Sequence, residues 1–172
     1  MGIFGRKRDD DQQASSEPRP VELLRSFTPE QYAEGLSDWA WLGLDDLAPV
    51  AATSFGDVFL QGRGGLWFLD TVEGALTRAV DDWTQMARVL STDEGEDQYL
   101  LAGLALGAAE RGLAPGPDEV YAFSLPPVLG GPMDVEHVQL LDFVVAHRIF
   151  GQIHEQIKDL PPGSPISSIT IE

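Results

Sequence analysis

The sequence contains no cysteine among its 172 residues. This absence excludes disulfide bonds, thiolate metal sites and catalysis by a thiol nucleophile. Long apolar runs are missing as well, since none approaches the roughly 18 to 20 residues that span a bilayer. The first residues, MGIFGRKRDDDQQ, lack the apolar core of a secretory signal. The sequence therefore predicts a cytoplasmic protein that does not contact membranes.

Positive charge is scarce, with 11 Lys and Arg against 28 Asp and Glu and a net charge of −17. Residues 1–26 hold five basic and five acidic residues, so the net charge lies entirely on residues 27–172. Such a body repels nucleic acid and attracts basic partners, whose association it accelerates by about 10- to 1000-fold at low salt. The alternative is an acidic surface that serves only solubility.

The composition divides the chain into a tail and one domain. Residues 1–20 mix charged blocks with Gln, Ser and Pro and offer almost nothing to bury, which predicts a disordered tail. Residues 21–172 suit a single domain, because their length allows a sizeable core and the apolar share of the whole chain, 43%, is ordinary.

Local patterns predict helices and strands in mixed order. A capping box at Thr28-Pro29-Glu30-Gln31 opens a helix that ends near Asp38. Apolar runs over 57–61 and 66–69 flank a glycine-rich turn and predict a β-hairpin. Further helices are expected over 70–90 and 93–112, a strand near Tyr121 and a terminal strand over 166–171. This order predicts an α+β fold with a small antiparallel or mixed sheet packed against several helices.

The longest predicted helix runs from a cap at Asp134 to about Lys158. Its apolar residues recur at spacings of three and four, which places them on one face of an amphipathic helix. Gly151 interrupts this helix and indicates close approach of another backbone. Gln152 and Gln156 lie beside it, and if their amides are buried we expect a strand or loop backbone to bind them. The apolar face comprises Val138, Leu141, Val145, Ile149, Ile153 and Ile157.

The histidines His137, His147 and His154 are the obvious candidates for catalysis or metal binding. A helical metal pair requires a spacing of three or four residues, whereas these lie ten and seven residues apart. We therefore expect no metal, no cofactor and a structural role for the histidines. A small hydrolase that uses His147, His154 and nearby carboxylates is the alternative.

The densest acidic patch comprises Asp93, Glu94, Glu96 and Asp97. Asp93 and Glu94 fall in the first turn of a predicted helix, where negative charge stabilises the helix dipole. A rigid acidic helix start could also imitate phosphate and enter the cationic cleft of a nuclease. These four residues are the candidate contacts to a partner.

Four segments together carry a family resemblance. They are FGDVFLQGRGGLWFLDTVEG, PPVLGG, GQIHEQIKDLPPG and ISSITIE, which lie within residues 54–171 apart from the final Glu172. In these segments the chain resembles the C-terminal domain of type VI secretion DNase-immunity proteins. The motif residues to which we assign a structural role are Asp57, Asp70, Gly74, Pro127, Gly130, Gly131, Gly151, Gln152 and His154.

The resemblance implies a function by binding rather than by catalysis. An immunity protein neutralises a cognate protein toxin, and a basic nuclease is one candidate class of toxin for this acidic chain. A housekeeping protein-interaction domain without a toxin partner remains the second alternative beside the hydrolase.

Overall fold

The computed structural model of the protein describes residues 21–161, 164, 166 and 168–172. The tail predicted over residues 1–20 lies outside the described residues. Within the described ranges the chain forms two antiparallel sheets and five α-helices, so the predicted α+β class is confirmed.

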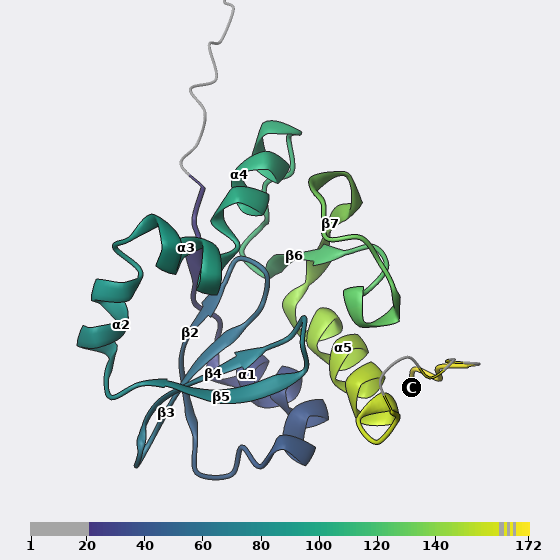
Figure 1. Cartoon of the computed structure of the whole chain (residues 1–172), viewed down its shortest axis with the longest axis horizontal. Helices are drawn as coiled ribbons and strands as arrows, with labels where there is room; N and C mark the ends of the chain where they lie inside the picture. The colour runs from purple at the N-terminus through teal and green to yellow at the C-terminus, as the bar shows by residue number, and fades with distance from the viewer. Residues whose placement is uncertain (1–20, 162–163, 165, 167) are drawn as a thin grey trace, which may run out of the picture.

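The larger sheet has five antiparallel strands in chain order (Figure 1). The predicted hairpin is its β3–β4 pair, in which Gly62 lies opposite Gly65. Gly65 has a φ of 126°, which side chains rarely adopt, so glycine is needed at this turn. The strands are β1 (Leu24–Arg25), β2 (Ala48–Thr53), β3 (Val58–Gly62), β4 (Gly65–Asp70) and β5 (Ala75–Val80).

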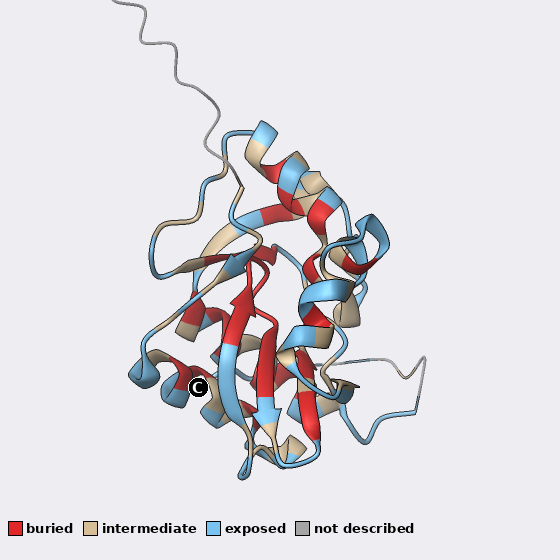
Figure 2. Ribbon diagram, turned by 90° about the vertical axis from the view of Figure 1, so that its left-hand side faces the viewer, coloured by how far each residue is buried: buried red, intermediate tan, exposed pale blue. Residues whose placement is uncertain are grey.

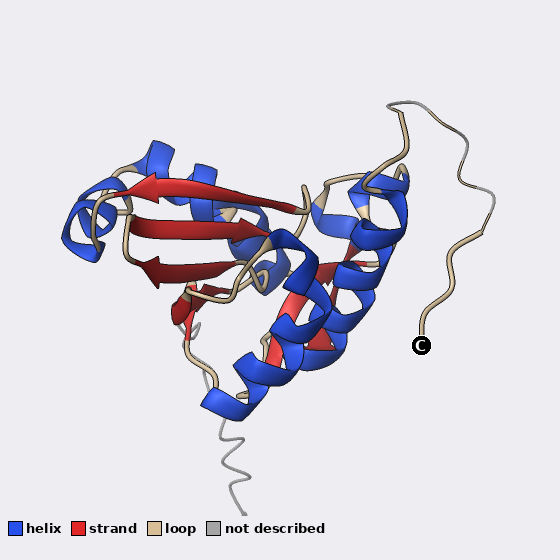
Figure 3. Cartoon of the chain, turned by 90° about the horizontal axis from the view of Figure 1, so that it is seen from below, coloured by secondary structure: helices blue, strands red, loops and turns tan. Residues whose placement is uncertain are grey.

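Helices cover both faces of this sheet, as Figures 1 and 3 show from two directions. Successive side chains of a strand point to opposite faces, so the buried run of β3 serves two cores. Val58 and Leu60 pack with Trp39 on the face covered by three helical segments, whereas Phe59 packs with Met86 on the other. The first face carries α1 (Pro29–Gly35), the 3-10 helix η1 (Leu36–Leu42) and α5 (Phe143–Ile157), and the second carries α2 (Trp83–Val89) and α3 (Asp93–Leu100).

A second sheet of two antiparallel strands, β6 (Glu119–Phe123) and β7 (Val138–Asp142), lies beside α5 in Figure 1. Helix α4 (Ala102–Glu110) covers it through Ala105 and Ala108, which pack against Tyr121 and Phe123. The 3-10 turns η2 (Pro127–Leu129) and η3 (Val135–His137) lie between the two strands in the chain. Figure 2 shows that buried residues follow the strands and the inner sides of the helices.

Helix α1 begins as predicted. The Thr28 side chain accepts a hydrogen bond from the Gln31 amide, and the Gln31 side chain accepts one from the Thr28 amide. The aromatic residues that follow are core residues, with Tyr32 and Trp39 buried and Trp41 packed against the same cluster.

The long helix predicted from Asp134 begins later, at Phe143. Asp134 does act as a cap, but only of the short turn η3, and Asp142 caps α5 by accepting from the Val145 amide. Residues 138–142 form β7 instead, because β6 lies opposite and supplies their backbone hydrogen bonds, with Val138 facing Phe123. The spacing of three residues between Val138 and Leu141 also suits a helix, and the local sequence does not show that β6 lies opposite.

Three further predictions of secondary structure are wrong. The helix predicted over 70–90 is a turn followed by β5, because Leu76 pairs with Leu69 across the sheet, and α2 begins only after the cap Asp82. The helix predicted over 93–112 is broken at Leu101, where φ is 49°. In the stretch 166–171, the residues that the structure describes are not in a strand.

Gly151 is buried where α5 crosses η1. A Cβ at this position would lie 2.7 Å from the carbonyl oxygen and 2.8 Å from the Cβ of Asp38. The predicted close approach of another backbone is therefore confirmed. By contrast, a Cβ on Gly103 of α4 would meet only Asp97 Oδ1 at 3.6 Å.

We expect Gly151→Ala to lower the free energy of unfolding by about 1–3 kcal/mol, because the added methyl group would overpack the crossing of α5 and η1. Alanine is the better helix former by roughly 0.5–1 kcal/mol, so the loss would oppose intrinsic propensity. Gly103→Ala is the matched control and should be neutral or stabilising. Urea unfolding of both variants is the measurement, and a Gly151→Ala protein as stable as the parent would contradict the packing argument.

Candidate functional site

His147 anchors α5 to the turn between β2 and β3. Its Nε2 donates a hydrogen bond to the carbonyl oxygen of Gly56 at 2.7 Å, and the residue is only 1% exposed. Burial lowers the pKa of His147 to about 4, with the Gly56 contact opposing the shift. The imidazole is therefore neutral at pH 7 and serves as a structural donor.

His154 has the same role further along α5. Its Nε2 donates to the carbonyl oxygen of Thr71 at 3.1 Å, and burial lowers its pKa as well. The ring lies so close to Gly74 that a Cβ there would be 2.2 Å from Nδ1. Trp39 contacts both histidines, with ring centroids 5.6 Å from His154 and 6.1 Å from His147. The motif residues Gly74 and His154 are thus brought together by packing.

Asp57 is a buried carboxylate that joins two turns of the larger sheet. It accepts hydrogen bonds from the Thr71 amide at 2.8 Å, the Thr71 hydroxyl at 2.7 Å and the Thr53 hydroxyl at 3.1 Å. Burial raises the pKa of Asp57 to about 6, and the nearby charge of Asp70 adds to the shift, although the hydrogen bonds oppose it.

Asp70 shapes the turn that Asp57 binds. Its carboxylate accepts hydrogen bonds from the amides of Val72 and Glu73, and Gly74 completes the turn with a φ of 66°. The motif residues Asp57, Asp70, Gly74 and His154 therefore meet around the β4–β5 turn, where each holds the backbone in place.

Gln152 and Gln156 bind the end of the chain. The Gln152 side chain accepts from the Glu172 amide at 2.8 Å and donates to Asp38 Oδ1 at 3.1 Å. Gln156 exchanges hydrogen bonds with the backbone of Thr170, at 2.7 and 3.1 Å. The burial on which the expectation depended is absent, since Gln152 is half-buried and Gln156 exposed, but both amides do bind a backbone segment.

Pro127, Gly130 and Gly131 form the tight loop before β7. Gly130 has a φ of 89°, and a Cβ on Gly131 would lie 1.9 Å from the Leu125 carbonyl oxygen. This loop approaches the other motif residues through Val128, which lines a hollow of about 510 Å³ together with Gly74 and His154.

The acidic cluster of Asp93, Glu94, Glu96 and Asp97 lies on α3, on the opposite side of the larger sheet from α5 (Figure 1). Asp93, Glu94 and Asp97 are exposed and Glu96 is half-buried. Asp97 Oδ1 accepts from the Gly103 amide, which ties α3 to α4. None of the ion pairs among the described residues involves any of the four.

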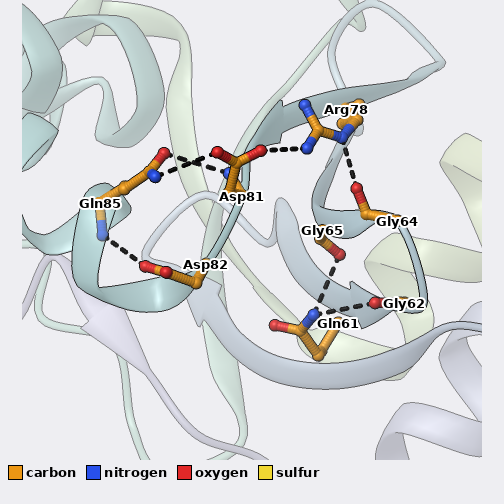
Figure 4. Close-up of polar contacts among 8 residues, drawn as sticks. All are labelled: Gln61, Gly62, Gly64, Gly65, Arg78, Asp81, Asp82 and Gln85. Atoms are coloured by element: carbon orange, nitrogen blue, oxygen red, sulfur yellow. Dashed lines mark hydrogen bonds and ion pairs between the residues drawn. The ribbon is translucent and has the colours of Figure 1, made fainter.

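The Arg78 side chain is engaged in local structure. Figure 4 shows Arg78 of β5 bound to the Gly64 carbonyl oxygen and to Asp81, which in turn binds Gln85. The hydrogen bond from Arg78 lowers the pKa of Asp81. The glycine-rich segment is thus a braced hairpin turn.

All three histidines are engaged in local contacts. The two histidines that a hydrolase would need are buried and bound to carbonyl oxygens, while His137 is paired with Asp134. Within the described ranges no three or more His, Asp or Glu side chains are grouped to hold a metal ion. Nor is any helix in them long and apolar enough to cross a membrane.

A groove beside β2 was not predicted from the sequence. It has a volume of about 580 Å³ and lies between β2 and the segment formed by α1 and η1. The sequence patterns predicted a helix end near Asp38 and no strand before the hairpin, although the run APVAAT carries a weak strand signal.

This arrangement defines an α+β domain whose polar motif residues fasten turns and helices to one another. Residues 82–154 match the model of a family described as T6SS immunity protein Tdi1, C-terminal. The resemblance stated from the sequence is thereby confirmed over this range, which contains the acidic cluster, Pro127 and His154 but not Asp57, Asp70 or Gly74.

Two other comparisons add little. No curated protein matches the chain. Among solved structures, the crystal structure of Atu4351 from Agrobacterium tumefaciens is similar at a TM-score of 0.46 and 18% identity, over 77% of this chain and 67% of that one. This similarity is too low to bear on function.

We expect the stability advantage of the parent over His147→Gln to shrink by about 2 kcal/mol between pH 7 and pH 5. The folded pKa of His147, about 4, lies below its unfolded value of 6.5, so unfolding takes up a proton in this window and the parent loses stability as the pH falls. Glutamine does not titrate, and the opposite contribution of Asp57 is common to both proteins. Urea unfolding at the two pH values is the measurement, and a constant difference would contradict a neutral, buried His147.

Proposed function

We propose that this protein is a non-enzymatic immunity protein that acts in the cytoplasm and neutralises a cognate toxin by binding it directly. The observation that carries the proposal is the match of residues 82–154 to the T6SS immunity protein family. The matched range includes α3 with its exposed acidic cluster and most of α5, which holds the fold together.

The charge of the chain favours a basic nuclease as the toxin. A nuclease binds phosphates through cationic side chains, and an acidic surface can occupy the same cleft. The net charge is −17, and the four acidic residues of α3 have no basic partner in the described ranges of the chain. The same charge opposes direct binding of the immunity protein to nucleic acid.

The burial of the histidines argues against the hydrolase alternative. A general base must reach a substrate proton, but His147 and His154 are 1% and 5% exposed and their Nε2 atoms are hydrogen-bonded to the backbone. The acidic cluster of α3, by contrast, needs no rearrangement to meet a partner.

The proposal is tested with the product of the gene adjacent to the one that encodes this chain. Co-expression should protect cells that the product alone kills, and the two purified proteins should form a stable complex. Absence of both effects would favour a housekeeping interaction domain.

We expect joint replacement of Asp93, Glu94, Glu96 and Asp97 by their amides to slow association with this product and to flatten its salt dependence. Dissociation should change less, because exposed charges steer encounter over distances near the Debye length, about 8 Å at physiological salt. The Asp97→Asn change retains a side-chain oxygen that can accept from the Gly103 amide. Stopped-flow binding across a salt series is the measurement.

The matched control removes four exposed acidic charges elsewhere: Glu110, Glu136, Glu155 and Asp159. It changes the net charge equally, so a larger effect of the α3 variant would locate the contact. Equal association rates for the two variants would remove α3 from the interface.

A further inference from the structure

The groove beside β2 is lined by apolar side chains, and none of the motif residues lines it. It lies outside residues 82–154, the range matched by the family model. Val50 is 42% exposed, although it belongs to a strand, and Leu44 and Leu47 are half-buried. The apolar lining includes Phe27, Leu36, Leu44, Leu47, Pro49 and Val50.

One wall of the groove is an incompletely paired sheet edge. Strand β1 pairs with β2 only at Ala52 and Thr53, and the chain then turns away through Ser26 and Phe27, which line the groove. On that side of β2, no strand of the described chain pairs with residues 48–51. A free edge of this kind can accept an extended segment of another chain.

The irregular pairing of β2 limits which segment can bind. Its register against β3 shifts between Pro49 and Ala51, and Pro49 has no amide hydrogen to donate. A long flat strand therefore finds few partners here, whereas a short extended segment with an apolar side chain can use the hollow between β2 and α1.

The charge at the groove is negative. Asp45 lines it, and the exposed residues Glu30, Glu34 and Asp46 each follow a lining residue in the chain. None of the lining residues is Lys or Arg, and no ion pair within the described ranges uses these four carboxylates. A basic segment would complement this charge.

We propose that the groove is the anchor site for an extended apolar and basic segment of the toxin. An apolar side chain of the segment lies between Val50 and α1, and a Lys or Arg side chain faces Asp45. The inference rests on the proposed function and deepens it, because it assigns steering to α3 and anchoring to the groove.

Val50→Asp and Val145→Asp form a matched pair that tests the anchor. Both replace an exposed valine, 42% and 45% exposed, and both add one negative charge, but Val145 lies on α5 and does not line the groove. With the product of the adjacent gene as the probe, Val50→Asp should raise the dissociation constant by about tenfold or more, mainly through faster dissociation. Val145→Asp should bind as the parent does.

Hydrogen exchange of the parent provides a test that needs no variant. Binding of the same product should increase the protection of residues 44–53, whereas β5, which lies at the opposite edge of the sheet and pairs with β4, should gain none. Protection of β5 alone would place the toxin at the opposite edge and overturn the inference.

Three other outcomes would also overturn it. Equal affinity of the parent and Val50→Asp would leave the proposed function standing without this anchor, whereas no binding by the parent would remove both. Self-association of the parent that Val50→Asp abolishes would assign the groove to a second copy of this chain. Protection of residues 44–53 in the free protein that disappears on deletion of residues 1–20 would assign it to that segment.

Discussion

The fold depends on the close contact between α5 and the segments that it crosses. Gly151 allows the helix to approach the backbone of Asp38, and this brings Trp39 against both His147 and His154. Each histidine then reaches a different turn of the larger sheet, one through the Gly56 carbonyl oxygen and one through that of Thr71. A side chain at position 151 would push α5 away from Asp38 and weaken all of these contacts at once, because a packed interior cannot absorb the added volume.

The buried polar residues that hold the fold together are different from the acidic residues that face solvent. Asp57, His147 and His154 are buried and hydrogen-bonded, so they are costly to expose and contribute little to an outer surface. The carboxylates of α3 and those around the β2 groove face outward without basic partners among the described residues, on different elements of the domain.

Local signals in the sequence predicted the elements whose ends depend on local chemistry. The capping box fixed the start of α1, and the glycine-rich turn between two apolar runs predicted β3 and β4. Gly151 indicated a close backbone, since glycine within a helix otherwise lowers stability. The sequence could not show that residues 75–80 and 138–142 form strands, because their spacing of three and four also suits a helix and the pairing strand lies elsewhere in the chain.

By itself, the sequence determined the acidity of the chain, the absence of thiol chemistry, the capping box of α1 and the hairpin turn that requires glycine, since each follows from residue type and near neighbours. Only the tertiary structure decided which carbonyl oxygens the histidines bind and that Asp57 is buried beside Thr71. It also decided that β1 leaves several residues of β2 unpaired beside α1. These features arise from segments far apart in the chain, and their energy depends on burial and on partners that no local pattern contains.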